Sequence, residues 1–139
     1  MLLAGPPGVG KRAAAAWMVE QKLSVGAGTP VPVFPIAATE HPDLRWLRQL
    51  EDKQSISIDQ VRELVAELSL TSYLGRGKVA VVDPASAMNR NAANGLLKTL
   101  EEPPGDTLMI LIADRLGNLP ATILSRCQRI NFHLPAAAD

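Results

Sequence analysis

The residues best suited to chemistry lie near the start of the chain, where residues 5–11 read GPPGVGK. This segment matches the pattern G-x-x-x-x-G-K and lies between a short apolar stretch and a run of strong helix formers. In that context the backbone N–H groups of the turn and the positive end of the following helix can bind phosphate, and the lysine can reach the outer phosphates. A glycine-rich turn with a purely structural role is the alternative. The residues that we expect to hold a phosphate are Gly5, Pro6, Pro7, Gly8, Val9, Gly10 and Lys11.

The next position departs from the pattern. A Ser or Thr hydroxyl normally ligates Mg²⁺ there, whereas this chain has Arg12. A guanidinium has no lone pair to give to a metal, and it adds a positive charge beside the metal's place. Metal-assisted hydrolysis therefore loses a ligand.

A second departure follows a strand that we expect to be buried. Residues 78–83 read KVAVVD, an apolar run that ends in Asp83 as a Walker B strand does. Such an aspartate holds the water shell of Mg²⁺, and an acid after it orients the attacking water. Here Pro84 follows, which has neither a carboxylate nor an N–H group. An aspartate that simply ends a buried strand is the alternative, but the two departures, at positions 12 and 84, together argue against turnover.

An arginine near the end of the chain is a third candidate. Ser125, Arg126 and Cys127 lie between a short expected helix and the last expected strand. Arg126 can be an ordinary surface cation. In ring ATPases, however, an arginine at such an edge reaches the next subunit's nucleotide and raises the rate roughly 10³–10⁵-fold. We interpret Cys127 as a small, buried apolar residue rather than a nucleophile.

Alternating strands and helices are predicted to position these residues. That alternation implies a parallel sheet flanked by helices. In the first helix we expect Trp17 to be available for the core face. We expect strands at residues 1–4, 42–50, 78–83, 108–113 and 128–134, and helices at 11–23, 58–72, 89–100 and 119–124.

Composition limits the remaining classes of function. The 139 residues carry no net charge, 47% are hydrophobic and 20% are charged, as in a single globular domain that is not a general nucleic-acid binder. No apolar run is long enough to span a membrane. The single cysteine cannot form an internal disulfide, which fits the cytoplasm, and the two histidines lack the spacing of metal ligands, so we expect no metal site.

Taken in order, several segments closely resemble the δ′ family of bacterial DNA polymerase III clamp-loader subunits, which are AAA+ proteins. The resemblance covers almost the whole chain. Its most specific parts are residues 94–104, NGLLKTLEEPP, and the Ser-Arg-Cys triplet at 125–127; LLAGPPGVGK, HPDLRWL, ISIDQVRELVAELSLTS and LPATILSRCQRI also match.

The resemblance implies an α/β fold: a three-layer P-loop NTPase domain of the AAA+ type with a five-stranded parallel sheet flanked by helices. It also implies a pentamer with δ and the γ/τ ATPases that loads the sliding clamp onto primed DNA within the DNA polymerase III holoenzyme. In that family δ′ is a stator that does not hydrolyse ATP. The arginine of its Ser-Arg-Cys triplet acts in trans on a neighbour's ATP, a role that falls here on Arg126.

Three departures from the family limit what is carried over. Many relatives have a four-cysteine zinc module after the first helix, whereas residues 26–35 contain no cysteine, so no zinc is expected. The sensor position after the fourth strand is usually Thr or Asn, and Asp114 there would repel a γ-phosphate. Family members also begin earlier and continue into a helical lid and a collar domain. We therefore expect residues 1–139 to be a single first domain.

Three functions stay open at this point. The favoured one is a non-hydrolysing δ′-like subunit with degenerate Walker A and Walker B segments, the latter at Asp83, which needs no cofactor and binds nucleotide or an anion weakly. The second is a γ/τ-type ATPase that tolerates Arg12. The third is an unrelated P-loop protein that binds nucleotide and works alone.

Overall fold

The computed structural model describes residues 1–6, 10–23, 43–48, 55–70, 77–114 and 119–132 of the chain. Strands and helices alternate along it, as the sequence predicts. The strands are β1 (Leu2–Ala4), β2 (Leu44–Arg48), β3 (Lys78–Asp83), β4 (Thr107–Ala113) and β5 (Arg129–Asn131), and the helices are α1 (Lys11–Leu23), α2 (Ile58–Leu68), the 3₁₀ turn η2 (Ala85–Ala87), α3 (Arg90–Glu101) and α4 (Ala121–Leu124).

The five strands form one parallel sheet in the order β2-β3-β4-β1-β5, which confirms the predicted architecture. Every residue of β1 and β3 is buried, as expected for strands covered on both faces. Because all strands run in the same direction, the ends of β1, β3 and β4 open at the same edge of the sheet. Gly5, Lys11 and the two candidate acids, Asp83 and Asp114, therefore lie at one edge.

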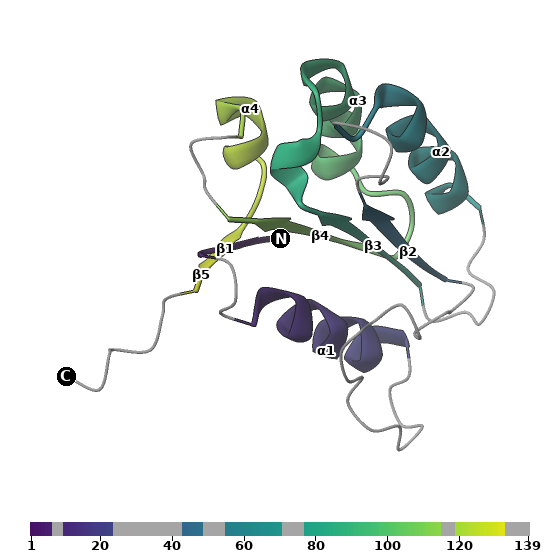
Figure 1. Ribbon diagram of the computed structural model, residues 1–139. Coiled ribbons are helices and arrows are strands. Elements are labelled where there is room, and N and C mark those ends of the chain that lie inside the picture. Colours follow the sequence, from purple (N-terminus) through teal and green to yellow (C-terminus); the bar gives the residue numbers. More distant parts are fainter. Residues whose placement is uncertain (7–9, 24–42, 49–54, 71–76, 115–118, 133–139) are drawn as a thin grey trace, which may run out of the picture.

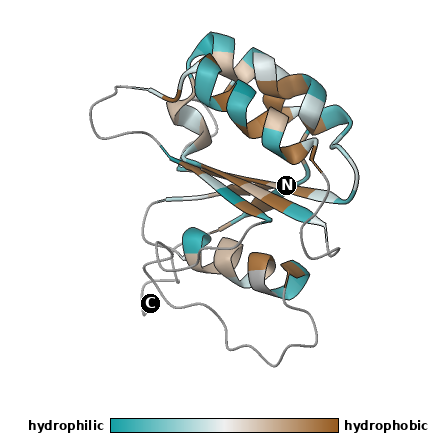
Figure 2. Ribbon diagram, turned by 90° about the vertical axis from the view of Figure 1, so that its right-hand side faces the viewer, coloured by the Kyte–Doolittle hydropathy of each residue, from teal (hydrophilic) through white to brown (hydrophobic). Residues whose placement is uncertain are grey.

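The helices make the fold three layers deep (Figure 1): α1 covers one face of the sheet, and α2, α3 and α4 cover the other. Apolar side chains of the strands point alternately into two cores, so Leu2 packs on the side of α2 and α3 while Leu3 packs on the side of α1. Figure 2 shows the largely hydrophobic strands of the sheet between two layers of helices that carry both hydrophilic and hydrophobic residues. No helix among the described residues is long and apolar enough to cross a membrane.

The position of Trp17 differs from the expectation. The core face of α1 is formed by Ala15, Val19 and Leu23, which are four residues apart and all buried. Trp17 lies two residues from Ala15, roughly 200° around the helix, and its exposure is 48%. The prediction that Trp17 is available for the core face was wrong, because the helical period places the smaller residues against the sheet.

The second helix begins at a full capping box, in which the Ser57 side chain accepts from the Gln60 N–H and the Gln60 side chain accepts from the Ser57 N–H. It ends earlier than predicted, since Ser69 is already its C-cap. The 3₁₀ turn after Pro84 was not predicted at all. It starts a segment in which Met88 bridges to Ile56 and Asn89 caps α3.

Candidate functional site

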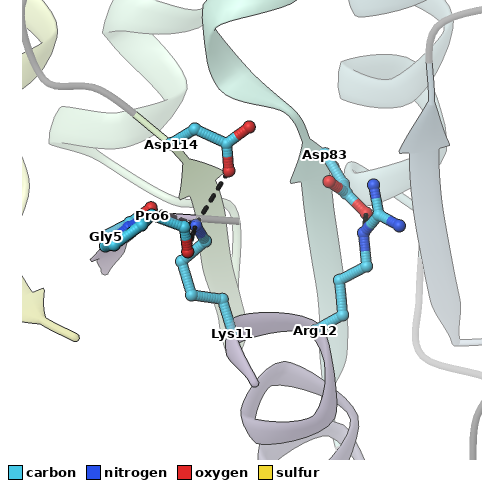
Figure 3. Close-up of polar contacts among 6 residues, drawn as sticks. All are labelled: Gly5, Pro6, Lys11, Arg12, Asp83 and Asp114. Atoms are coloured by element: carbon cyan, nitrogen blue, oxygen red, sulfur yellow. Dashed lines mark hydrogen bonds and ion pairs between the residues drawn. The ribbon is translucent and has the colours of Figure 1, made fainter. Parts of the chain in front are cut away.

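Lys11 is the first residue of α1 and its side chain is almost fully buried, with an exposure of 5%. The ammonium donates to the backbone oxygens of Gly5 and Pro6, the latter at 3.0 Å, and to Oδ1 of Asp114 at 2.8 Å (Figure 3). An ammonium has three N–H donors, so these three acceptors saturate it. A phosphate could bind Lys11 only by displacing one of them.

Arg12, one residue further along α1, makes the second ion pair of this edge. Its Nε lies 2.7 Å from Oδ2 of Asp83, the last residue of β3 (Figure 3). The Asp83 side chain is only 3% exposed, and its other described partner is the indole N–H of Trp46 at 3.4 Å. A buried carboxylate needs a partner charge, and here Arg12 supplies it.

These contacts bear directly on a bound Mg²⁺. Its two expected protein positions are Arg12, which cannot ligate a metal, and Asp83, whose carboxylate is already paired with that arginine. No group of three or more His, Cys, Asp or Glu side chains within the described part of the chain is placed to hold a metal ion. The described residues therefore do not fit the metal that P-loop hydrolysis requires.

Asp114 follows β4 and is half-exposed, with its carboxylate directed at Lys11. The sequence led us to expect that this acid would face a phosphate, but it did not predict that the carboxylate would pair with Lys11. Nor did it predict the pairing of Arg12 with Asp83. One signal was present: two adjacent cations begin a helix, and acids come at or just after the ends of two neighbouring strands.

Gly5 has a packing role that the motif alone did not reveal. Its N–H donates to the Ala113 oxygen at 3.1 Å, and its φ of 154° is rare for residues with a side chain. A Cβ at this position would lie 2.4 Å from the Phe132 carbonyl oxygen. Glycine is therefore required where the chain leaves β1 and passes the segment that follows β5. Of the other expected phosphate-binding residues, Gly10 has a φ of 90° with open space around it, and Pro7, Gly8 and Val9 lie outside the described residues.

Arg126 lies on the other side of the sheet from α1, in the turn that follows α4. Its Nη1 donates to the Thr122 oxygen at 2.9 Å, and its Nε pairs with Oε1 of Glu101 at the end of α3. The Arg126 side chain keeps 31% of its surface exposed. Arg126 is thus a solvent-accessible cation that is held by two contacts. It lies in a different part of the fold from Lys11 and Arg12.

Cys127 is half-buried and packs against the core on the side of the sheet covered by α2, α3 and α4. Burial raises the pKa of its thiol. A raised pKa suits a structural thiol rather than a nucleophile, in line with the interpretation from sequence.

Comparison with known sequences identifies several relatives of the chain. The model of the family described as "DNA polymerase III, delta subunit" matches residues 1–136. The chain is 45% identical to DNA polymerase III subunit delta' of Pseudomonas aeruginosa, covering 99% of this chain and 44% of the relative. It is 40% identical to the Escherichia coli subunit delta', covering 70% and 29%, and 33% identical to subunit tau/gamma of Haemophilus influenzae, covering 97% and 20%. The chain therefore spans less than half the length of these curated relatives.

Solved structures support the same fold. A DNA polymerase III gamma subunit-related protein of Thermotoga maritima superposes with a TM-score of 0.73 at 24% identity, covering 97% of this chain and 41% of that chain. The RuvB protein of the same organism superposes with a TM-score of 0.61 at 18% identity, covering 96% and 36%. At these identities the two structures establish the fold and nothing finer.

Proposed function

The chain belongs to the family of DNA polymerase III delta' subunits, and on that basis we propose that it is the first domain of a clamp-loader subunit of this type that does not hydrolyse ATP. Family membership removes the alternative of an unrelated P-loop protein that works alone.

The observation that carries this proposal is the pair of ionic contacts at the phosphate-binding edge. Asp114 forms an ion pair with Lys11, which would hold the outer phosphates, and Arg12 forms an ion pair with Asp83, which would support Mg²⁺. Pro84 adds no acid to orient water. The Asp114 carboxylate and the Arg12 guanidinium thus make contacts that nucleotide and metal would otherwise make. This favours a subunit whose fold is stable without nucleotide or metal.

Arg126 is the residue that we propose to act on another subunit. Its side chain stays accessible to solvent although it pairs with Glu101, whereas the side chains of Lys11 and Asp83 are buried. In this role it would enter the ATP site of a neighbouring γ/τ subunit and stabilise negative charge on the transferring phosphoryl group. The active site to which it contributes would belong to the neighbour.

The complex implied is a cytoplasmic pentamer with δ and the γ/τ subunits, in which this chain is the stator. Relatives named as subunits delta' and tau/gamma of DNA polymerase III support the kind of assembly. The sliding clamp and primed DNA would be bound by the whole complex, since this chain carries no net charge with which to attract nucleic acid by itself. Its contribution to replication is then to load the clamp for the DNA polymerase, not to polymerise DNA.

The decisive experiment is to measure the ATPase activity of a complex reconstituted from γ/τ, δ and this protein carrying Arg126→Ala. We expect the rate stimulated by clamp and primed DNA to fall by roughly 10²-fold or more, with assembly intact by gel filtration. Arg129→Ala is the matched control, because Arg129 is an exposed cation three residues away. Equal rates for Arg126→Ala and the unaltered complex would remove Arg126 from the mechanism.

A γ/τ-type ATPase is the second candidate, and the 33% identity to a tau/gamma subunit over 97% of the chain favours it. It predicts Mg²⁺-dependent ATP hydrolysis by the purified protein that Lys11→Ala abolishes. Our proposal predicts no such activity, so a single assay with that variant separates the two.

A further inference from the structure

Glu101 and Arg126 come from different helical segments and meet on the face of the sheet opposite α1. Glu101 is the last residue of α3, and Arg126 follows the C-cap of α4, Ser125. The Glu101 carboxylate accepts from Arg126 Nε, and the Thr122 carbonyl accepts from Nη1 at 2.9 Å. Ser125 Oγ lies 3.4 Å from the same Nη1. One arginine side chain is thus held by groups from both α3 and α4.

The contacts leave one edge of the guanidinium available. Of its five N–H donors, the one on Nε is used by Glu101, and those on Nη1 face Thr122 and Ser125. Nη2 has no partner among the residues that the structure describes. An incoming phosphate oxygen can therefore bind at Nη2 while the contacts on Nε and Nη1 persist.

We propose that Glu101 is a positioning residue for Arg126, holding the guanidinium so that its Nη2 edge faces the ATP of the neighbouring subunit. The inference rests on the proposed trans role of Arg126. A free arginine side chain samples many rotamers, and fixing it in one of them costs conformational entropy. Because Glu101 already restrains Arg126 before the neighbouring subunit binds, less conformational entropy is lost when the guanidinium contacts the phosphoryl group in the correct geometry.

Removing Glu101 should weaken catalysis less than removing the arginine itself. In the reconstituted complex we expect Glu101→Ala to lower kcat for clamp- and DNA-stimulated ATP hydrolysis about 3- to 30-fold, with KM for ATP nearly unchanged. Glu101→Gln keeps an oxygen acceptor for Nε and should recover part of the loss. Glu102→Ala is the matched control, because Glu102 is an adjacent exposed carboxylate with no ion pair among the described residues.

Comparison in the background of Arg126→Ala separates positioning from a structural role. If Glu101 acts through Arg126, Glu101→Ala will cause no further loss once the arginine is gone. An equal loss in both backgrounds would show a structural role, and an unchanged or faster rate for Glu101→Ala would overturn the proposal. If Glu101→Ala fails to assemble, Glu101→Gln in the same comparison decides the question.

The same experiment distinguishes this inference from the proposed function. If Arg126→Ala has no effect on the rate, the trans role fails and there is no finger for Glu101 to position. If Arg126→Ala is slow while Glu101→Ala equals Glu102→Ala, the trans role stands and only the positioning role of Glu101 is lost.

Discussion

The carboxylate of Asp83 and the guanidinium of Arg12 lie 2.7 Å apart, although the first ends β3 and the second belongs to the first turn of α1. The arginine therefore has two effects at once. It stands where the motif usually has the Ser or Thr hydroxyl that ligates Mg²⁺. It also places a permanent positive charge beside the carboxylate that would otherwise support the metal's water shell. The buried acid stays paired in the absence of a metal ion.

We predict that Arg12→Ala destabilises the protein by about 1–3 kcal/mol, because it leaves the buried Asp83 carboxylate with only the weak indole contact of Trp46. The value lies below that of a fully buried pair, since more than half of the Arg12 side chain is exposed. Urea unfolding monitored by circular dichroism measures the change in the free energy of unfolding.

Arg62→Ala is the control: Arg62 pairs with Asp59 at 3.8 Å on the exposed surface of α2, where a loss under about 1 kcal/mol is expected. Equal effects of the two variants would contradict a stabilising role for the Arg12–Asp83 pair.

A different consequence is expected at Asp114. Replacing it with Asn removes a negative charge beside Lys11 and weakens the contact that holds the ammonium. We predict that Asp114→Asn tightens ATP binding roughly tenfold or more, as measured by calorimetry, without creating hydrolysis, because Pro84 still provides no acid to orient water.

Two controls accompany this prediction. Lys11→Ala added to Asp114→Asn should abolish the gain. Asp106→Asn removes a comparable carboxylate, paired with Lys22 at 2.7 Å away from the loop, and should leave ATP binding unchanged. An identical gain from Asp106→Asn would mean that overall charge, and not release of Lys11, controls the affinity.

The elements of the fold followed closely from the sequence, because their signals are local. The first helix begins and ends where its run of helix formers does, and the two continuous apolar runs became the central strands β3 and β4. The face of that helix was harder to predict, because Trp17 is its largest apolar residue and yet the period of Ala15, Val19 and Leu23 sets the core side.

The ion pairs of the candidate site were not predictable in the same way. Lys11 and Asp114 are separated by 103 positions in sequence, and their contact depends on strand order, which places β4 beside β1. The pairing of Arg126 with Glu101 likewise requires α3 and α4 to pack on the same face of the sheet. Sequence identified most of these residues one by one, whereas which charge meets which is set by tertiary structure.

Cys127 gives a prediction that depends on pH. Because burial raises the pKa of its thiol, less thiolate is present at a given pH than in an unfolded chain. Alkylation by iodoacetamide should therefore be slower in the folded protein at neutral pH and should rise with pH over a range shifted upward from that of an ordinary cysteine. Mass spectrometry reads the single site directly, since the chain has one cysteine. Urea-unfolded chain is the control; equal rates before and after unfolding would contradict a buried, protonated thiol.

Gly5→Ala tests whether the first glycine of the motif is needed for packing. A Cβ at this position would meet the Phe132 carbonyl oxygen at 2.4 Å, and the φ of 154° is strained for alanine. Because the neighbouring atom is backbone, the segment after β5 must move to make room, and its Phe132 N–H bond to the Ala4 oxygen should weaken. We predict a loss of about 2–4 kcal/mol in the free energy of unfolding, with faster amide exchange at Phe132.

Gly105→Ala is the matched control for Gly5→Ala. The φ of Gly105 is 57° and therefore also positive, but no atom lies near the added Cβ, so strain of about 1 kcal/mol is expected. Similar losses for the two variants would mean that backbone conformation, and not the contact with Phe132, requires glycine at position 5.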